Sequence, residues 1–175
     1  QHGLTRASHL VDQMLQLARL DPESGLPDPQ AVDLAMVAEV VCAELGAEIL
    51  RKNIDFDLSV SAPCAVSGQS DWLRVLIRNL VDNAIRYTPE HGSVRVCIRQ
   101  KDGACELTVS DSGPGIPVAE RSNVLRRFHR LKHAEQSGSG LGLPIVARIA
   151  ELHGAQLTFG DSASAGLEVK VHWTL

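Results

Sequence analysis

The feature that most constrains this chain is a helical segment with two asparagines, followed by two glycine-rich turns. The segment is Asn79-Leu-Val-Asp-Asn83-Ala-Ile-Arg86-Tyr87. Its apolar residues fall at helical spacing, so one face packs on a core: Leu76, Ile77, Leu80, Val81, Ala84 and Ile85. Taken alone, two asparagines in a helix indicate a solvated surface or a cap. Here the asparagine face must border the core, where polar groups need partners.

The spacing of the two asparagines indicates a metal site. Asn79 and Asn83 are four residues apart and therefore share one face of the helix. Two carboxamide oxygens on one face are hard donors that suit Mg²⁺ held against phosphates. Arg86 can reach phosphate from the same region, and Tyr87 offers an aromatic face to a base. The segment therefore favours a magnesium-nucleotide site.

The first glycine turn, Asp111-Ser-Gly113-Pro-Gly115, follows an alternating segment that is typical of a strand. The Asp111 carboxylate is only an acceptor, which suits an exocyclic amine. Gly113 and Gly115 allow a ligand to approach the backbone closely. By itself this motif fits a tight surface turn equally well, because its residues are favourable in turns.

The second glycine turn, Gly138-Ser-Gly140-Leu-Gly142, runs into a helical pattern with Pro144 in its first turn. A glycine loop that leads into a helix N-terminus presents free N–H groups and a positive dipole to phosphates. It is not a P-loop, because no Gly-Lys-Ser/Thr follows. Neither turn fits a dinucleotide-binding fingerprint, because the third glycine is replaced by Leu143 in this turn and by Val118 in the first turn.

In this order, the motifs resemble the catalytic ATP-binding domain of bacterial sensor histidine kinases, in the superfamily shared with gyrase, Hsp90 and MutL. Residues 79–89 match the family's N box, and residues 111–117 match its first glycine box. The segment 127–130 matches the F box, and residues 138–143 match the second glycine box. The resemblance covers about residues 69 to 175. The chain also resembles the QseC-type sensor kinases, which pair with OmpR-like response regulators.

The resemblance implies a role for each matching residue. Asn83 would ligate Mg²⁺ with help from Asn79, and the phosphates of ATP would meet the catalytic residues Asn79, Arg86 and Arg130. The adenine pocket would be formed by Tyr87, Asp111, Gly113, Gly115 and Ile116. The phosphate loop would be formed by Gly138, Gly140, Leu141 and Gly142, and residues 131–136 would be a mobile lid.

Two positions depart from patterns found among relatives. Asn79 stands where gyrase-like and Hsp90-like proteins carry a glutamate that activates water. An amide is not a general base at neutral pH, so we expect slow hydrolysis and a γ-phosphoryl group kept for a histidine. In the last strand, Gly166 and Leu167 stand where relatives often carry a threonine near the base. The alternatives are an ATPase of the gyrase and Hsp90 kind, a non-catalytic nucleotide-binding interaction module, and an anti-sigma-type serine kinase.

The first residues carry a separate signal. Leu4, Ala7, Val11, Met14 and Ala18 follow the 3-4-3-4 spacing of a coiled-coil or bundle seam. This stretch resembles the second helix of the kinase dimerisation domain, although it could instead be a helix of the ATP-binding domain. We therefore predict part of a dimerisation domain over residues 1–21, a proline-rich linker over 22–30, and the catalytic ATP-binding domain over 31–175.

None of the seven histidines lies in the phosphoacceptor motif of the family, a histidine followed by an acidic residue and Leu-Arg-Thr-Pro. We therefore expect a fragment without the sensor, membrane spans and acceptor helix, which binds ATP but does not phosphorylate itself. The resemblance implies a homodimeric full-length protein, in which this is the cytoplasmic domain of an inner-membrane sensor. It also implies relay to an OmpR-like response regulator through the dimerisation domain.

Composition sets further limits. A chain of 175 residues with 44% hydrophobic residues can bury one core and carry an appended helix. The net charge of −4 argues against nucleic acid as a partner. Four cysteines without CxxC spacing indicate reduced, mostly buried thiols in a cytosolic protein: Cys42, Cys64, Cys97 and Cys105. The sequence contains no run of about 18 apolar residues, so no membrane span is predicted within it.

Helical and strand patterns are mixed along the chain without strict alternation. This favours an α/β (α+β) two-layer sandwich with one mixed sheet and helices on one face. The resemblance implies the Bergerat-type ATP-binding fold, preceded here by an N-terminal helix. Helices are predicted over 4–20, 34–51 and 71–87, with a short one after Pro117 and a last one from Pro144. Strands are predicted over 54–60, 93–99, 104–110, 156–159 and 167–174.

Overall fold

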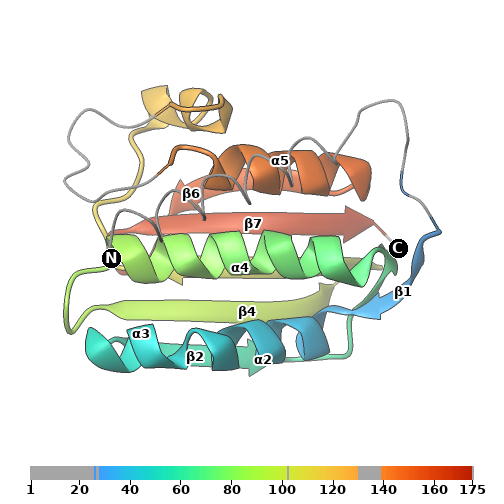
Figure 1. Cartoon of the computed structure of the whole chain (residues 1–175), viewed down its shortest axis with the longest axis horizontal. Coiled ribbons are helices and arrows are strands. Elements are labelled where there is room, and N and C mark those ends of the chain that lie inside the picture. The colour runs from blue at the N-terminus through green and yellow to red at the C-terminus, as the bar shows by residue number, and fades with distance from the viewer. Residues whose placement is uncertain (1–25, 27, 102, 130–138, 175) are drawn as a thin grey trace, which may run out of the picture.

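The computed structural model describes residues 26, 28–101, 103–129 and 139–174. Its main sheet has five strands in the order β2-β4-β5-β7-β6. These strands are β2 (Asp55–Val60), β4 (Ser93–Lys101), β5 (Ala104–Asp111), β7 (Leu167–Thr174) and β6 (Gln156–Asp161). β2 pairs with β4 in parallel, and the other pairs are antiparallel. The predicted mixed sheet is confirmed (Figure 1).

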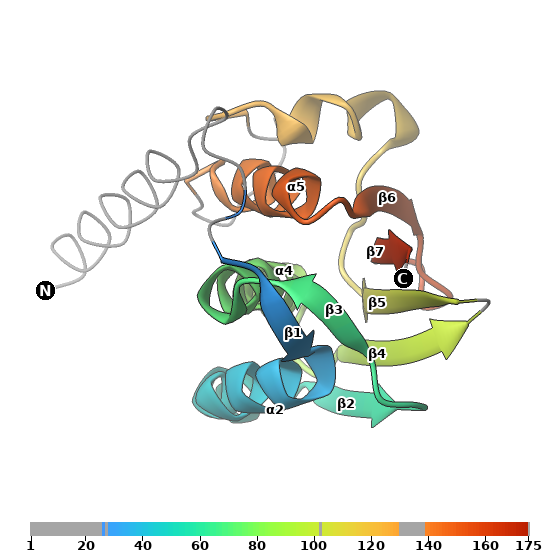
Figure 2. The ribbon, with the colours of Figure 1, turned by 90° about the vertical axis from the view of Figure 1, so that its right-hand side faces the viewer.

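The helices form the second layer. They are α2 (Leu34–Glu44), α3 (Gly46–Arg51), α4 (Ser70–Tyr87) and α5 (Gly142–Leu152), with short 3-10 turns η1 (Val118–Glu120) and η2 (Asn123–Leu125). Figure 2 shows α2, α4 and α5 on the same face of the sheet. The two-layer sandwich is therefore confirmed. No helix among the described residues is both long and apolar enough to cross a membrane.

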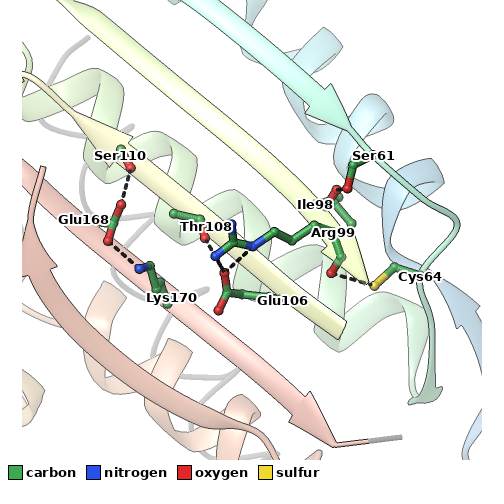
Figure 3. A network of polar contacts seen from close by, with 9 residues as sticks. All are labelled: Ser61, Cys64, Ile98, Arg99, Glu106, Thr108, Ser110, Glu168 and Lys170. Carbon is green, nitrogen blue, oxygen red and sulfur yellow. Dashed lines mark hydrogen bonds and ion pairs between the residues drawn. The ribbon is translucent and has the colours of Figure 1, made fainter. Parts of the chain in front are cut away.

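The two faces of the sheet differ in chemistry because side chains alternate along a strand. On the helix side, residues such as Val96, Leu107 and Val171 are fully buried. On the other face, Figure 3 shows a polar network in which Glu106 accepts from Arg99 Nε at 2.8 Å and Glu168 pairs with Lys170 at 2.8 Å. The single buried face explains why all the core helices lie on one side.

Two details differ from the prediction. The helix predicted over 34–51 is divided into α2 and α3 at Leu45, directly before Gly46. A separate two-stranded sheet was not predicted: β1 (Gln30–Asp33) pairs antiparallel with β3 (Ala65–Gly68). β1 ends at Asp33, whose side chain accepts from Ala35 N at 2.9 Å and caps α2. The end of the predicted linker therefore pairs with the folded domain.

The prediction that all four cysteines are free thiols is wrong for two of them. Cys64, which directly precedes β3, forms a disulfide with Cys105 of β5. Cys42 and Cys97 are free, and burial raises the pKa of the Cys42 thiol to about 11. The disulfide joins the small β1–β3 sheet to the middle of the main sheet. The predicted helix over 4–20 lies outside the described residues.

Candidate functional site

The site is built around two antiparallel helices, α4 and α5. α5 begins beside Asn79 and Asn83 of α4, where a Cβ on Gly142 would lie 3.1 Å from Asn79 Oδ1 and 3.3 Å from Asn83 Nδ2. α5 ends beside the start of α4, where His153 Nε2 accepts a hydrogen bond from Gln69 N at 3.1 Å. Buried apolar residues of both helices, including Leu80 and Ile145, hold this arrangement. The asparagine pair and the second glycine turn are therefore brought together.

Asn79 has a defined orientation in this site. Its Nδ2 donates to Val75 O, one turn earlier in α4, at 2.8 Å. Because that bond occupies the amide nitrogen, the Oδ1 atom is the one that faces Gly142. The predicted oxygen donor thus points toward the N-terminus of α5, and Asn83 borders the same glycine.

The N-terminus of α5 receives no side-chain cap from the part of the chain that the structure describes. Four backbone N–H groups at a helix start lack partners within the helix, although here Pro144 has no N–H and Leu141 N donates to Ser139 Oγ at 3.2 Å. Gly140, just before the helix, has φ +69° and lies against the backbone of Phe128 and His129. Phe128 N donates to Gly140 O at 3.1 Å, so the F-box segment holds the second glycine turn in place. Such a helix start beside two amide side chains is suited to an anion and its cation.

Asp111 lies at the end of β5 and points to the helix side of the sheet, like Leu107 and Val109 before it. The residue is only 7% exposed. Its Oδ1 accepts from Gly113 N at 2.8 Å and from Leu167 N at 3.2 Å. Oδ2 receives no hydrogen bond from the residues that the structure describes. Burial raises the pKa of the carboxyl, while the two backbone N–H groups lower it.

The glycines near Asp111 are required by close packing. A Cβ on Gly113 would lie 2.9 Å from Tyr87 O, so the first glycine turn contacts the end of α4. Gly115 has φ +69°, and a Cβ there would lie 3.4 Å from Gly166 O. Gly166 lies against the Asp111 backbone, and a Cβ on it would lie 2.5 Å from Asp111 Oδ1. All three predicted motifs therefore meet around the C-terminal half of α4.

The end of α4 has its own cap. Lys52, at the end of α3, donates from Nζ to Ile85 O at 2.7 Å, to Arg86 O at 3.0 Å and to Thr88 O at 2.5 Å. Burial lowers the pKa of this ammonium, with the nearby Arg51 charge acting in the same direction. The positive charge stabilises the negative end of the helix dipole. Lys52 thereby fixes the backbone that carries Arg86 and Tyr87.

The remaining predicted residues have varied positions. Arg86 is half-buried and paired with Asp82, Nη2 to Oδ2, at 2.6 Å. Tyr87 and Ile116 are half-buried, and Ile116 O accepts from Arg121 Nε at 3.1 Å. Leu141 is fully buried, and its backbone is engaged: its N donates to Ser139 Oγ at 3.2 Å and its O accepts from Ile145 N at 3.0 Å. Arg130, Gly138 and the segment 131–136 lie outside the described residues.

Sequence reasoning missed three supporting residues, namely Lys52, Gly166 and Leu167. Each acts across a long sequence separation, 33 to 36 residues for the Lys52 hydrogen bonds and 56 residues for the bond from Leu167 to Asp111. The one signal in the sequence was the glycine at 166, at a position already noted as unusual. Glycine is expected wherever two backbones approach closely.

Comparison with known proteins places this geometry in a family. The family model for "Histidine kinase-, DNA gyrase B-, and HSP90-like ATPase" matches residues 68–175. The chain is 38% identical over 172 residues to the sensor protein QseC of Salmonella typhi, covering 98% of this chain and 37% of QseC. It is 40% identical over 171 residues to the sensor protein kinase PmrB of Pseudomonas aeruginosa, covering 97% of this chain and 36% of PmrB.

A solved structure agrees with these relatives. Full-length ShkA in complex with AMPPNP superimposes with a TM-score of 0.82 at 26% identity, over 95% of this chain and 35% of ShkA. The family resemblance predicted from the motifs is thus confirmed, and ATP is the nucleotide class of the family. The chain therefore belongs to the histidine kinase-, DNA gyrase B- and HSP90-like ATPase family, and within it to the ATP-binding domains of sensor histidine kinases.

Proposed function

We propose that this domain binds Mg²⁺-ATP and presents the γ-phosphoryl group to a histidine outside the chain, for relay to a response-regulator aspartate. The observation that carries this proposal is the position of Asn79 and Asn83 against Gly142, at the start of α5. A phosphate group there would accept from helix N–H groups, and the amide oxygens on the other side would be placed to ligate a Mg²⁺ ion bound to that phosphate. Such a site can hold phosphates and neutralise their charge together.

At the base end, Asp111 is the proposed selector of adenine. Oδ1 is already used by Gly113 N and Leu167 N. Oδ2 is left as the acceptor for the exocyclic amine, a group that guanine does not offer in the same place. Tyr87, Gly113, Gly115 and Ile116 complete the proposed pocket, in which the glycines keep the backbone close to the base.

At the phosphate end, Asn83 is the proposed Mg²⁺ ligand and Asn79 its helper. The amide oxygens fit a hard cation, and Mg²⁺ commonly combines one or two protein oxygens with phosphate oxygens and water. When bound, the ion supplies charge neutralisation to the phosphates. Gly140 and Gly142 would offer backbone N–H groups, Leu141 would join them by exchanging its bond to Ser139 Oγ for a phosphate oxygen, and Gly138 and Arg130 would also take part. Arg86 would exchange its Asp82 partner for a phosphate oxygen.

The phosphoryl-transfer chemistry needs positioning and charge stabilisation more than a covalent role for the protein. Asn79 carries an amide where a water-activating base would have to lie, and its Nδ2 is held by Val75 O. This favours transfer to histidine over the alternative of an ATPase of the gyrase and Hsp90 kind. The presence of Asn83, Asp111 and both glycine turns also favours a nucleotide-binding domain over a non-catalytic interaction module.

The wider setting belongs to the same proposal. The chain spans 37% of the length of QseC and 36% of PmrB, which are named as sensor proteins. We propose that the protein containing this domain acts as a homodimer, passes its phosphoryl group to an OmpR-like response regulator, and holds this domain on the cytoplasmic side of an inner membrane. Residues 1–21 would be part of its dimerisation domain.

Calorimetric titration with ATP or a non-hydrolysable analogue tests the proposal, with and without Mg²⁺. We expect a dissociation constant of roughly 1–500 μM, or about −4.5 to −8 kcal/mol, strengthened by Mg²⁺. Asn83→Ala should remove most of the Mg²⁺ effect while the protein stays folded. Absence of binding by folded wild-type protein would contradict the proposal, and steady ATP turnover without an acceptor would favour the hydrolase.

A further inference from the structure

The outer surface of α2 and α3 carries an unusual apolar row. Met36 is 66% exposed, Val40 50% and Leu50 77%, and Ala43 and Ala47 between them are also exposed. These five residues follow a 4-3-4-3 spacing along two helices that continue one another along the molecule (Figure 1). That spacing is the seam of a helix pair, yet none of the described elements covers it. We call these five residues the outer stripe.

One segment of the chain has the matching pattern. Leu4, Ala7, Val11, Met14 and Ala18 follow a 3-4-3-4 spacing, which is the reverse of the outer stripe. Placed antiparallel, the two rows therefore match at every member, without a slip. The facing pairs are Ala18 with Met36, Met14 with Val40, Val11 with Ala43, Ala7 with Ala47, and Leu4 with Leu50. Two of these pairs, at Met36 and at Ala43, set a large side chain against a small one, as interdigitating helices favour.

We infer that residues 4–18 form a helix that packs antiparallel on the outer stripe of the same chain. The chain path permits this contact. β1 begins at Gln30 and ends at Asp33, the N-cap of α2, so the chain enters the domain at the Met36 end of the stripe. The residues between Ala18 and Gln30 can span more than about 30 Å when extended, at about 3.3 Å per residue. They need only reverse direction to place Ala18 beside Met36.

Charge supports the same occupant. The segment 1–20 contains Arg6 and Arg19 against one acid, Asp12. α2 and α3 contain three acids against one base, and in this register Arg6 faces Glu48. Of these acids, Glu44 already pairs with Arg74 and Arg78 of α4. At the Met36 end lies a hollow of about 470 Å³, lined in part by Asp28, Asp33 and Asp71. Arg19 would follow Ala18 into this acidic region. Such flanking pairs select the partner and its orientation.

The contact has a consequence for the longer protein. A helix that belongs to a dimerisation bundle uses its apolar seam to face its bundle partners. The same seam cannot face a bundle partner and the outer stripe at once. Docking on the outer stripe therefore competes with bundle packing. When docked, the ATP-binding domain would lie beside residues 4–18 of the proposed dimerisation domain.

Paired cysteines in the complete chain test the register. In a Cys42→Ser, Cys97→Ser background, Met14→Cys with Val40→Cys should give a disulfide within one chain under mild oxidation, located by peptide mapping. Met14→Cys with Leu50→Cys is the control, because Leu50 lies about 15 Å further along the helices and should not react. A link between two chains, as for packing of a second copy or a bundle, would overturn the inference, as would equal linking of both pairs or no linking.

Hydrogen exchange gives an independent readout. In wild-type protein the amides of residues 4–18 should be protected, and Val40→Glu should raise their exchange rates at least tenfold. Glu39→Gln, also exposed on α2 but outside the stripe, should leave them unchanged. Both changes lie on the surface, so α4 amides serve as the check on folding. Rapid exchange of residues 4–18 in wild-type protein would overturn the inference. Equal protection of these residues in wild-type protein and in Val40→Glu would also overturn it.

Discussion

The two ends of the α4–α5 pair treat buried polar groups in opposite ways. At one end, His153 is 8% exposed and has both nitrogens engaged: Nδ1 donates to Ile149 O at 2.8 Å, and Nε2 accepts from Gln69 N. At the other end, Asp111 uses one oxygen, its second oxygen accepts no hydrogen bond from the described residues, and the N-cap residue of α5, Leu141, makes no side-chain cap bond. The closed end holds the helices together. The open end keeps unsatisfied groups for a ligand, at some loss of stability.

The largest expected effect is at the open end. Asp111→Asn keeps an oxygen for Gly113 N and Leu167 N but presents an N–H₂ group where the proposed adenine contact needs an acceptor. ATP affinity should fall at least about 100-fold, because two donors would face each other in a buried site. Calorimetry measures the affinity, and Asp57→Asn, on the exposed edge strand β2, is the control.

The same variant should not unfold the protein. The pKa of Asp111 is raised in the fold, so its stabilising contribution is present at low pH and is lost as pH rises through the folded pKa. At neutral pH the buried charge is therefore unfavourable for folding. Asp111→Asn should leave the melting temperature equal or higher. A marked loss of stability would show that the open oxygen is structural.

The next effect concerns the capped end of α4. Lys52→Met removes three hydrogen bonds to the carbonyls of Ile85, Arg86 and Thr88. The free energy of unfolding should fall by about 2 kcal/mol, since a charged donor to buried acceptors is lost. Chemical denaturation measures the change. Arg51→Met, the exposed neighbouring base, should have little effect. If Lys52→Met and Arg51→Met lowered stability equally, positive charge near the end of α4 would be the cause and not the three hydrogen bonds from Lys52.

A smaller effect is expected at Gly142. Gly142→Ala would place a methyl group 3.1 Å from Asn79 Oδ1 and 3.3 Å from Asn83 Nδ2. Mg²⁺-ATP affinity should fall about tenfold, or about 1.4 kcal/mol, while the helix gains from the loss of glycine. Gly46→Ala is a matched control, because Gly46 also begins a helix and has open space at its Cβ. Unchanged affinity would show that the asparagine pair does not contribute to the proposed Mg²⁺-ATP site.

The smallest effect is at the closed end. Burial lowers the pKa of His153, and its neutral form alone lets Nε2 accept from Gln69 N. Its contribution to stability is therefore present above the unfolded pKa of about 6.5 and is lost as pH falls below it. Denaturation at several pH values should show this loss in wild-type protein and a flatter profile in His153→Gln. His172→Gln, half-exposed on β7, should retain the wild-type profile.

The sequence predicted the parts of the fold that repeat locally. α4 was predicted over 71–87 and is found at Ser70–Tyr87, because its apolar residues follow helical spacing over many turns. The paired strands β4 and β5 were predicted from their alternation. β1 and β3 were missed because four residues are too few for a period to be recognised. The disulfide was missed because cysteine spacing does not determine connectivity.

For the site, the motifs predicted which residue types to expect but not their supports. The meeting of Asn79 and Asn83 with Gly142 joins segments about 60 residues apart, and motif order alone suggested it. The cap from Lys52 and the support of Asp111 by Gly166 and Leu167 depend on how strands and helix ends approach in space. Such contacts leave no periodic trace in sequence, so they needed the folded arrangement.

The disulfide also connects two distant parts of the molecule. β1 is the first described strand after the linker, it pairs with β3, and Cys64 next to β3 is bonded to Cys105. Cys105 lies near the start of β5, and Asp111 is the last residue of that strand. Strand pairing, one covalent bond and a single strand therefore connect the start of the described domain to Asp111, without passing through a helix. A displacement of β1 would reach the proposed adenine pocket by this route.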